Sequence, residues 1–513
     1  MSEEKRIPDT MRQVLEELED RMQGRRVFRY MAEQESESPE DGWNSMQIKE
    51  ISGEQFFRDI KGTADLIRRN GLAGTHIGIM GANSYGWIMA LCAIFWSGSV
   101  AVLLDHETDP ADLRDRAQQV SLAGMICDSE ASETVRAAGL SGQIRSLEIR
   151  ELLIESREMR DSETDCAAAA EKRAEDLACI FFTSGTTGGS KAVMMSEHGL
   201  AAGICHRIQN RKFRAILAVL PFHHISGFSS ALNALYLGAE VCLAEQQKYF
   251  YKYLETMKPD YVFVVPSMLR MLARKLKNGG PSGRLLGWDL HMINCGGAAF
   301  CPEFLQMLLD RNITVMQGYG ASEAGAIGLL WEMTTDHPDT IGKPPAGLEI
   351  KIVDDELWMK SEAVMMGYYG DEEGTRKVLR DGWYITGDLC RMDADGYLYL
   401  TGRKKNLIIL SNGENISPEE IEGRLYQYEE IREAVVQAEG DLLTASIYPA
   451  YPRDCPAEEQ ERIREKIRRE AEEYNHSVPV YRQIRKVHFL EEPVGKTASG
   501  KLIRRSVPGG ERQ

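Results

Sequence analysis

A loop rich in glycine and hydroxyl side chains is the first segment whose residue types suit chemistry. It runs from Thr183 to Lys191 and directly follows the apolar stretch 177–182. Its glycines let backbone N–H groups turn toward one point, while its hydroxyls and Lys191 add donors and positive charge. This composition predicts an anion site that suits a triphosphate. A polar surface turn has a similar composition, so the loop alone leaves both interpretations open.

The loop differs from the Walker A loop of P-loop NTPases. That loop requires the pattern G-x-x-x-x-G-K-[ST]. Here Ser190 precedes the lysine and Ala192 follows it. The pattern fails on both sides of Lys191, so this type of phosphate loop is excluded.

Four isolated side chains further along the chain have types that suit nucleotide chemistry. Tyr319, at the end of a predicted strand, offers a face for stacking, although an unassisted tyrosine there more often packs in a core. Glu323 offers a hard oxygen to Mg²⁺, and Asp388 can accept two ribose hydroxyls or cap a turn. Lys501 lies on a Ser-Gly turn, where a single lysine is usually solvated. Each assignment needs support from its neighbours.

Composition limits the class of protein that positions these residues. The chain has 513 residues, beyond the ~250–300 at which one core stops growing, so several packed units are expected. Its net charge of −17 opposes nonspecific binding to nucleic acid or anionic lipid. Ten cysteines without a C-x-x-C pair, and an N-terminus without a signal-peptide pattern, predict a cytoplasmic protein.

The order of elements predicts an α/β fold. Helical stretches alternate with β-rich runs such as 75–80, 261–265 and 313–316, which favours parallel sheets covered by helices. The apolar segment Trp87 to Leu104 is long enough to imitate a membrane span. Ser97-Gly98-Ser99 interrupts it, which favours a buried helix followed by a strand and no transmembrane segment. A charged helix over 456–475 lies in a predicted small α+β C-terminal domain.

Several further motifs give the phosphate loop a family context. In kind, order and spacing, the series resembles the adenylate-forming superfamily of acyl-CoA synthetases, adenylation domains and firefly luciferase, from about residue 50 to 505. The motifs are Pro221-Phe222-His223-His224-Ile225-Ser226-Gly227, Gly296-Gly297-Ala298-Ala299, Gln317-Gly318-Tyr319-Gly320-Ala321-Ser322-Glu323, Tyr384-Ile385-Thr386-Gly387-Asp388, Gly402-Arg403-Lys404-Lys405, Asn412-Gly413-Glu414-Asn415-Ile416-Ser417-Pro418 and Lys496-Thr497-Ala498-Ser499-Gly500-Lys501. The family usually has Pro and Gly where this chain has Ser190 and Ala192.

The resemblance implies a fold and a domain division. It implies a large N-terminal domain of packed parallel sheets with a small β-barrel-like part over residues 1–401. A hinge follows over 402–405, with Lys405 at the hinge position. A small, mobile α+β catalytic lid domain then covers 406–513.

The resemblance also implies the roles of individual residues. Lys501, Glu323, Thr186 and Arg403 are the expected catalytic residues, and Glu323 and Thr186 the expected Mg²⁺ contacts; Lys496 and Arg504 are nearby alternatives to Lys501. ATP and AMP are expected to contact Thr183, Ser184, Gly185, Thr186, Thr187, Gly188, Lys191, Gly297, Ala298, Gly318, Tyr319, Gly320, Ala321, Ser322, Asp388, Arg403 and Lys501. The acyl pocket is expected at His224, Ile225 and Gly296, and the CoA tunnel at Gly413 and Glu414. His223 or His224 can equally be a structural partner.

The implied reaction uses ATP, Mg²⁺ and CoA. A carboxylate attacks the α-phosphate to give acyl-AMP and pyrophosphate, and a thiol then takes the acyl group. The segment His224-Ile225-Ser226 has no acid to pair an ammonium group, which argues against amino acids. The loop 411–420 looks most like medium- and long-chain fatty acyl-CoA synthetases. Two alternatives are transfer to the phosphopantetheine of a carrier protein and a catalytically silent nucleotide-binding relative.

Overall fold

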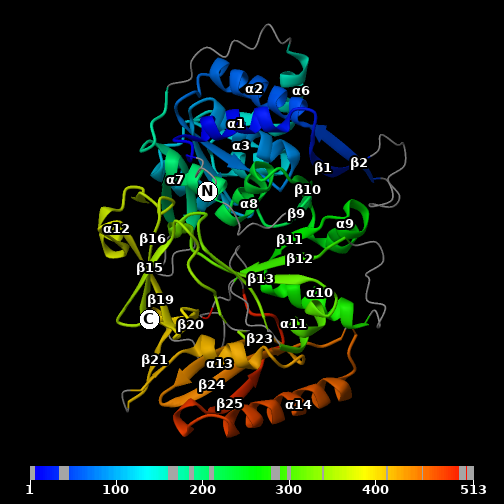
Figure 1. The fold of residues 1–513 in the computed structure, drawn as a ribbon, viewed down its shortest axis with the longest axis vertical. Helices are drawn as coiled ribbons and strands as arrows, with labels where there is room; N and C mark the ends of the chain where they lie inside the picture. Colours follow the sequence, from blue (N-terminus) through cyan, green and yellow to red (C-terminus); the bar gives the residue numbers. More distant parts are fainter. Residues whose placement is uncertain are drawn as a thin grey trace.

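The computed structural model shows an α/β protein with parallel sheets, as predicted. It describes residues 6–33, 46–159, 171–183, 190–206, 213–278, 289–296, 302–334, 336–337, 340–411, 414–452, 454–495 and 504. Figure 1 shows the helices and strands, with the segment from α13 onward gathered at one end of the long axis. Within the described residues, no helix is both long enough and apolar enough to cross a bilayer.

A seven-stranded sheet carries the phosphate loop. Its strand order is β17 (Gly367–Tyr368), β8 (Lys191–Ser196), β7 (Leu177–Thr183), β4 (Val100–Leu104), β3 (His76–Met80), β5 (Gly124–Cys127) and β6 (Arg145–Glu148). The strands from β7 to β6 pair in parallel, whereas β8 returns antiparallel to β7. All five residues of β4 are buried, as expected of a strand covered on both faces.

An eight-stranded sheet carries the motif that ends at Glu323. Its order is β14 (Leu329–Glu332), β13 (Thr314–Tyr319), β12 (Met292–Gly296), β11 (Tyr261–Val264), β9 (Ala215–Ala218), β10 (Glu240–Leu243), β1 (Arg26–Glu33) and β2 (Met46–Ser52). The central strands are parallel, and antiparallel pairs close both ends.

A layer of helices shares one core with both large sheets. It comprises α1 (Met11–Met22), α2 (Gly53–Arg69), α3 (Tyr85–Trp96), α6 (Ile149–Glu158), α7 (Glu197–Cys205) and α8 (Ile225–Tyr236). All residues of α3 are buried, because a helix that is apolar on every side is stable only inside such a layer. The prediction of a buried helix followed by a strand in Trp87 to Leu104 is confirmed.

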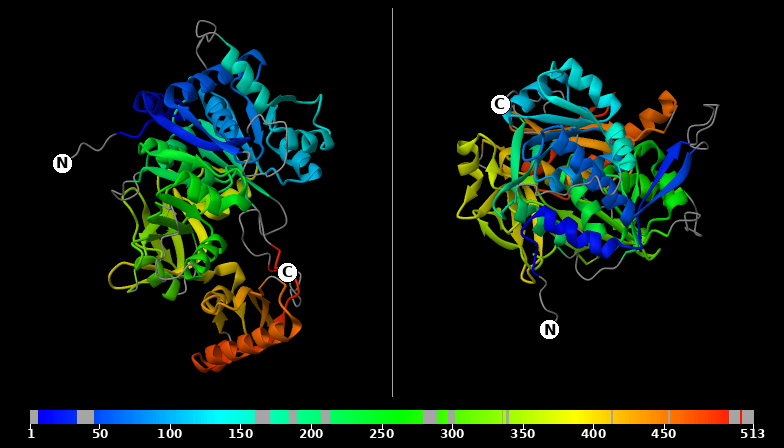
Figure 2. Two further views of the ribbon diagram at one scale, coloured as in Figure 1. Left: turned by 90° about the vertical axis from the view of Figure 1, so that its right-hand side faces the viewer. Right: turned by 90° about the horizontal axis from the view of Figure 1, so that it is seen from above.

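Further helices cover the outer faces of the two sheets. The core beyond the seven-stranded sheet contains α4 (Pro110–Gln119) and α5 (Ser129–Ala137). The core beyond the eight-stranded sheet contains α9 (Phe250–Met257), α10 (Pro266–Asn278) and α11 (Pro302–Leu309). The large region is therefore layered helix, sheet, helix, sheet, helix (Figure 2).

A third sheet replaces the predicted barrel-like part. It has the order β15 (Glu349–Val353), β16 (Glu356–Lys360), β19 (Trp383–Met392) and β18 (Leu379–Arg380), with β20 (Leu398–Arg403) paired to β19. Helix α12 (Glu372–Val378) precedes β18. Among the described residues no strand pair closes this sheet, so it is open, and the barrel-like description is corrected.

The C-terminal elements have a core of their own. They are β21 (Ile408–Ile409), β22 (Asn415–Ile416), α13 (Pro418–Leu425), β23 (Ile431–Glu439), β24 (Leu442–Pro449), α14 (Ala457–His476) and β25 (Ile484–Phe489). The buried cluster of these elements draws all its members from residues 408–489. The predicted charged helix over 456–475 is confirmed as α14.

Candidate functional site

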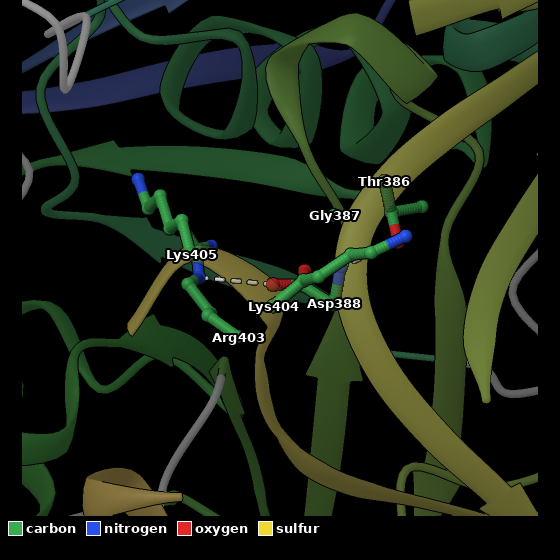
Figure 3. A pocket seen from close by; sticks show the side chains of 6 residues that line it. All are labelled: Thr386, Gly387, Asp388, Arg403, Lys404 and Lys405. Carbon is green, nitrogen blue, oxygen red and sulfur yellow. Dashed lines mark hydrogen bonds and ion pairs between the residues drawn. The ribbon is translucent and has the colours of Figure 1, made fainter. Parts of the chain in front are cut away.

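A pocket of about 330 Å³ lies where β19 and β20 meet the start of the C-terminal elements. It is lined by Thr386, Gly387, Asp388, Arg403, Lys404 and Lys405, two predicted motifs that are separate in sequence (Figure 3). The pairing of β19 with β20 sets Asp388 opposite Arg403. Asp388 lies within β19, which continues through an irregularity at Gly387, where φ is positive.

Asp388 is the buried acceptor at the centre of this pocket. Its Oδ2 accepts a hydrogen bond from the Tyr319 hydroxyl at 2.7 Å, and its Oδ1 lies 2.9 Å from Nε of Arg403. Only 8% of the Asp388 side chain is exposed. An ionised carboxylate has about four acceptor positions, so both oxygens retain capacity for hydroxyl donors.

Tyr319 brings the eight-stranded sheet to the pocket. It ends β13, and its side chain is buried. Burial, and then the charge of Asp388, raise the pKa of Tyr319 well above the usual range of a tyrosine. The phenol therefore stays protonated and acts as a fixed donor to Asp388.

Three of the six residues that line the pocket are cations, and one is a carboxylate. Arg403 pairs with Asp388, and Lys404 donates to Glu356 at 3.0 Å. Lys404 and Lys405 point to opposite sides of the pocket (Figure 3). A pocket lined by several cations favours an anionic ligand.

Glu323 lies in the short turn Ser322–Ala324 directly after the motif that contains Tyr319. The hydroxyl of Tyr368 donates to Oε1 of Glu323 at 2.9 Å, and the backbone N–H of Met365 donates to the Glu323 carbonyl at 2.9 Å. Burial, and then the charge of Glu323, raise the pKa of Tyr368. The carboxylate is thus held by a donor that remains protonated.

Lys191 reaches the same tyrosine from the phosphate loop. Its Nζ lies 4.4 Å from the centre of the Tyr368 ring, within the range of a cation–π contact. Strand β17, which contains Tyr368, pairs antiparallel with β8, which begins at Lys191. Tyr368 therefore connects the end of the phosphate loop to Glu323.

The two ends of the phosphate loop form a hairpin. Thr183 pairs with Lys191 and Phe182 with Ala192 across β7 and β8. The Ser190 hydroxyl donates to the Thr183 carbonyl at 3.1 Å, and Ala192 is buried in the strand. Both positions that depart from the family pattern are therefore accommodated by the hairpin. The loop tip Ser184, Gly185, Thr186, Thr187 and Gly188 lies outside the described residues.

Other predicted residues also fall outside the described part of the chain. They are Gly297, Ala298, Gly413 and Lys501. Gly318 and Gly296 lie side by side in neighbouring strands, and Gly320, Ala321 and Ser322 follow Tyr319 toward Glu323. Glu414 is exposed, and its carbonyl accepts the Leu410 N–H at 3.0 Å.

The predicted acyl-pocket histidine begins helix α8. His224 is the residue before Ile225, where α8 starts, and its ring centre lies 4.3 Å from that of His223. His223 is buried, and Nε2 of His223 lies 3.5 Å from Oδ2 of Asp105. Burial, followed by His224, lowers the pKa of His223.

Arg504 has a structural position. It lies 2.6 Å from each carboxylate oxygen of Glu422 and 3.1 Å from Oε1 of Glu419, both on α13. The Arg504 carbonyl accepts a hydrogen bond from Gln437 at 3.0 Å. These contacts fix the chain three residues after Lys501.

Three residues of the site were missed in the sequence. Tyr368 and Glu356 lie outside the motifs, and Lys404 lies within a motif that implies no role for it. Their contribution depends on strand pairing, since β17 meets β8 and β16 meets β19. A Gly-Tyr pair at 367–368 after a strand is too common to indicate such a role.

Comparisons with known proteins give the site a family. The model of the AMP-binding enzyme family matches residues 32–369, and that of the AMP-binding enzyme C-terminal domain matches 405–508. The long-chain-fatty-acid–CoA ligase of Mycobacterium bovis is 26% identical over 426 residues, which cover 71% of each chain. The 2-succinylbenzoate–CoA ligase of Bacillus mycoides is 27% identical over 462 residues, 84% of this chain and 89% of the relative.

A solved structure supports the fold. The O-succinylbenzoate coenzyme A synthetase of Bacillus subtilis, in complex with AMP, has a TM-score of 0.75 and 21% identity over 97% of this chain and 99% of that one. The predicted adenylate-forming superfamily and the predicted α/β fold are thus confirmed. The chain belongs to the AMP-binding enzyme family.

Proposed function

We propose that this chain activates a carboxylic acid as its acyl-adenylate with Mg-ATP and then forms a thioester with CoA. The observation that carries the proposal is the convergence of Tyr319, Asp388 and Arg403 from two sheets on one cationic pocket. Family membership supports an AMP-binding ligase, and relatives named as CoA ligases favour an AMP-forming acid–thiol ligase that uses ATP, Mg²⁺ and CoA.

The residues present suit an adenine nucleotide. Asp388 keeps acceptor capacity for ribose hydroxyls, and Arg403 supplies a nearby cation for phosphate. Beside Gly320, which follows Tyr319, the nearest atom to an added Cβ would be 4.0 Å away, which leaves room for a base. The hairpin from Thr183 to Lys191 would bind the terminal phosphates through its N–H groups and lysine.

Glu323, together with Thr186, would hold the magnesium ion. Mg²⁺ favours carboxylate and hydroxyl oxygens and neutralises phosphate charge when bound. In this chain, Tyr368 fixes the carboxylate and leaves Oε2 of Glu323 without a hydrogen bond to the tyrosine. Lys191 adds positive charge over the ring of the same tyrosine.

Lys501 would act in the first half-reaction. In sequence, Lys501 precedes the anchored Arg504 by three residues. A lysine that contacts both the carboxylate and the α-phosphate offsets the charge that develops during attack. The acceleration then rests on positioning and electrostatics, without a protein nucleophile.

The second half-reaction requires a change in the position of the C-terminal elements. We assign residues 1–401 and 406–513 to two domains, with a hinge over 402–405. Rotation about Lys405 would withdraw Lys501 and bring the loop of Gly413 and Glu414 to the thiol. The separate core of residues 408–489 supports movement of this part as a unit.

The favoured substrate is a medium- or long-chain fatty acid, admitted past His224 and Ile225 toward Gly296. Helix α8 begins at this point, and the segment His224-Ile225-Ser226 contains no acid to pair an ammonium group. Some relatives are named as ligases of succinylbenzoate, an aromatic acid, so the experimental test must include aromatic acids beside fatty acids.

Carboxylate-dependent exchange of pyrophosphate into ATP tests the first step. Saturated fatty acids of graded length, aromatic acids and succinylbenzoate are offered with Mg²⁺, followed by CoA or a holo-carrier protein with thioester detection by mass spectrometry. We expect exchange with a fatty acid and thioester formation with free CoA. Absence of exchange with every acid would contradict the proposal. Thioester formation only on the carrier protein would show that the acceptor is the carrier and not CoA.

The lysine assignment has its own test. Lys501→Ala should lower the exchange rate by roughly 100-fold or more, because the transition-state charge loses its partner. Lys496→Ala is the matched control and should retain most activity. Wild-type exchange in Lys501→Ala would remove this residue from the mechanism.

A further inference from the structure

A cluster outside the nucleotide pocket combines two imidazoles and a carboxylate. One ligand atom from each of Asp105, His106 and His223 lies within 4.8 Å of the other two. Nδ1 of His106 is 3.5 Å from Oδ1 of Asp105, and Nε2 of His223 is 3.5 Å from Oδ2 of Asp105. The carboxylate therefore lies between the two rings.

The spacing suits a single small cation. With metal–nitrogen distances of about 2.0–2.1 Å, neighbouring ligands of a tetrahedral ion lie roughly 3.3 Å apart. Each ring nitrogen lies 3.5 Å from one carboxylate oxygen of Asp105, His106 from Oδ1 and His223 from Oδ2, which is within a few tenths of an ångström of that value. Because the three ligand atoms lie within 4.8 Å of one another, side-chain rotations would bring them to one centre.

The buried member of the cluster has an unused nitrogen. The His223 side chain is 7% exposed, and within the described residues its Nε2 has no hydrogen bond. A buried polar atom without a partner is costly and points to a missing ligand. Oδ2 of Asp105 lies 3.5 Å from this nitrogen.

The backbone around the cluster is held in place. Asp105 and His106 directly follow the buried strand β4. The segment before His223 is fixed by Asn83, which donates to the Leu220 carbonyl and accepts the Phe222 N–H, both at 2.8 Å. The backbone that carries the three ligands is therefore held in place in two parts of the chain.

Access is open on one side. The His106 side chain is 40% exposed and that of Asp105 16%, so an ion can enter and water can complete its coordination. We propose that Asp105, His106 and His223 bind one divalent transition-metal ion of the Zn²⁺ type. Two imidazoles and one carboxylate suit zinc and neighbouring transition ions, whereas Mg²⁺ prefers oxygen ligands throughout. The site is therefore separate from the magnesium position proposed at Glu323.

Metal binding to untagged, EDTA-treated full-length protein tests the proposal, with Zn²⁺ as the probe and no nucleotide present. Bound metal is measured after desalting, and affinity by competition with a chromophoric chelator. We expect one equivalent of Zn²⁺ and a higher thermal midpoint in its presence, because an ion that binds only the folded state stabilises it. Co²⁺ should give visible absorption bands when bound.

Substitutions distinguish Zn²⁺ binding at this cluster from Zn²⁺ binding elsewhere on the protein. Asp105→Asn and His106→Gln keep the size of partly exposed side chains and should each weaken Zn²⁺ binding by at least about tenfold. His198→Gln is the matched control, since His198 lies near Asp9 and Glu362 without forming such a cluster. Less than stoichiometric Zn²⁺ on the wild type, or equal affinity in wild type and both variants, would overturn the proposal.

Discussion

At the scale of single residues, two tyrosines hold the carboxylates around which the proposed chemistry is arranged. Tyr319 donates to Asp388 at 2.7 Å, and Tyr368 donates to Glu323 at 2.9 Å. Burial raises the pKa of both phenols, so each remains a donor at neutral pH. A carboxylate fixed in this way requires less reordering when it meets a ligand.

Tyr368→Phe removes one hydrogen bond and keeps the ring beneath Lys191. A hydrogen bond to a charged group contributes about 1.5–3 kcal/mol, so we expect roughly a 10- to 100-fold rise in the Mg-ATP concentration needed for half-maximal exchange. The rate of pyrophosphate exchange, measured at a series of Mg²⁺ concentrations with fixed ATP, gives this half-maximal concentration. Tyr369→Phe, at the neighbouring position, is the control and should behave like the wild type. Equal magnesium dependence in both variants would contradict the role of Tyr368.

Glu197 predicts a pH dependence of stability. Its side chain is buried at the start of α7, where Oε2 accepts the Met11 N–H at 2.8 Å. Burial raises the pKa of Glu197 to about 7. Because the folded pKa lies above the unfolded one, the folded chain binds more protons between about pH 4.5 and 7, and stability falls as pH rises through that window.

Glu197→Gln removes the cost of ionising this group. We expect a higher thermal midpoint than the wild type at pH 8, with about 3 kcal/mol at stake, and little difference at pH 5. Scanning calorimetry at both values measures it. Glu130→Gln changes the same charge in an exposed first turn of α5 and serves as control. A gain of equal size at pH 5 would show that the effect does not arise from ionisation.

At the scale of elements, strand pairing joins motifs that are distant in sequence. The pairing of β19 with β20 sets Asp388 opposite Arg403, and that of β17 with β8 sets Tyr368 beside the strand that begins at Lys191. Helix α13 does the same for the C-terminal segment, because Glu419 and Glu422 bind Arg504. Each pairing supplies a position that no single motif contains.

Arg504→Ala should detach the segment that carries Lys501. Loss of one partner from a buried ion pair costs about 3–5 kcal/mol, because Glu422 is left buried without its cation. We expect a lower thermal midpoint and a large loss of pyrophosphate exchange, with partial recovery in Arg504→Lys. Arg482→Ala, which removes a more exposed pair with Glu420 on the same helix, is the control. Exchange at the wild-type level in Arg504→Ala would contradict the anchoring role.

At the scale of the whole molecule, the proposed nucleotide pocket lies between β19, β20 and the start of the C-terminal elements. Contacts of α10 link the large region to the C-terminal elements. Lys277 of α10 pairs with Glu429, and Arg270 lies 5.0 Å from the centre of the Tyr426 ring. Both members of the first pair are largely exposed, so separation costs little. The arrangement favours the domain rotation proposed for the second half-reaction.

Lys405→Pro tests that rotation. Proline fixes φ at its own position, so a backbone that must rotate there is held in one state. We expect pyrophosphate exchange to remain within a few-fold of the wild type, while thioester formation falls by more than roughly tenfold. Lys405→Ala removes the same side chain without the restriction and should retain both steps. An equal loss of both steps in the proline variant would argue against a hinge at Lys405.

The sequence alone determined the local features. The apolar run 177–182, the helix and strand within Trp87 to Leu104, and the charged helix near residue 460 were predictable, because hydrophobic periodicity and glycine breaks act over short distances. The ordered motifs determined the superfamily. The residue types that suit ATP can therefore be recognised from the sequence.

Only the tertiary structure decided which of these residues meet. Asp388 and Arg403 lie opposite each other because β19 pairs with β20, with a bulge in β19 at Gly387, where φ is positive. The expected barrel-like part is an open sheet among the described residues, because strand closure depends on long-range pairing. Tyr368 acquired its role from a two-residue strand paired with β8. Register between distant strands is set by the packing of the whole chain, which no local pattern encodes.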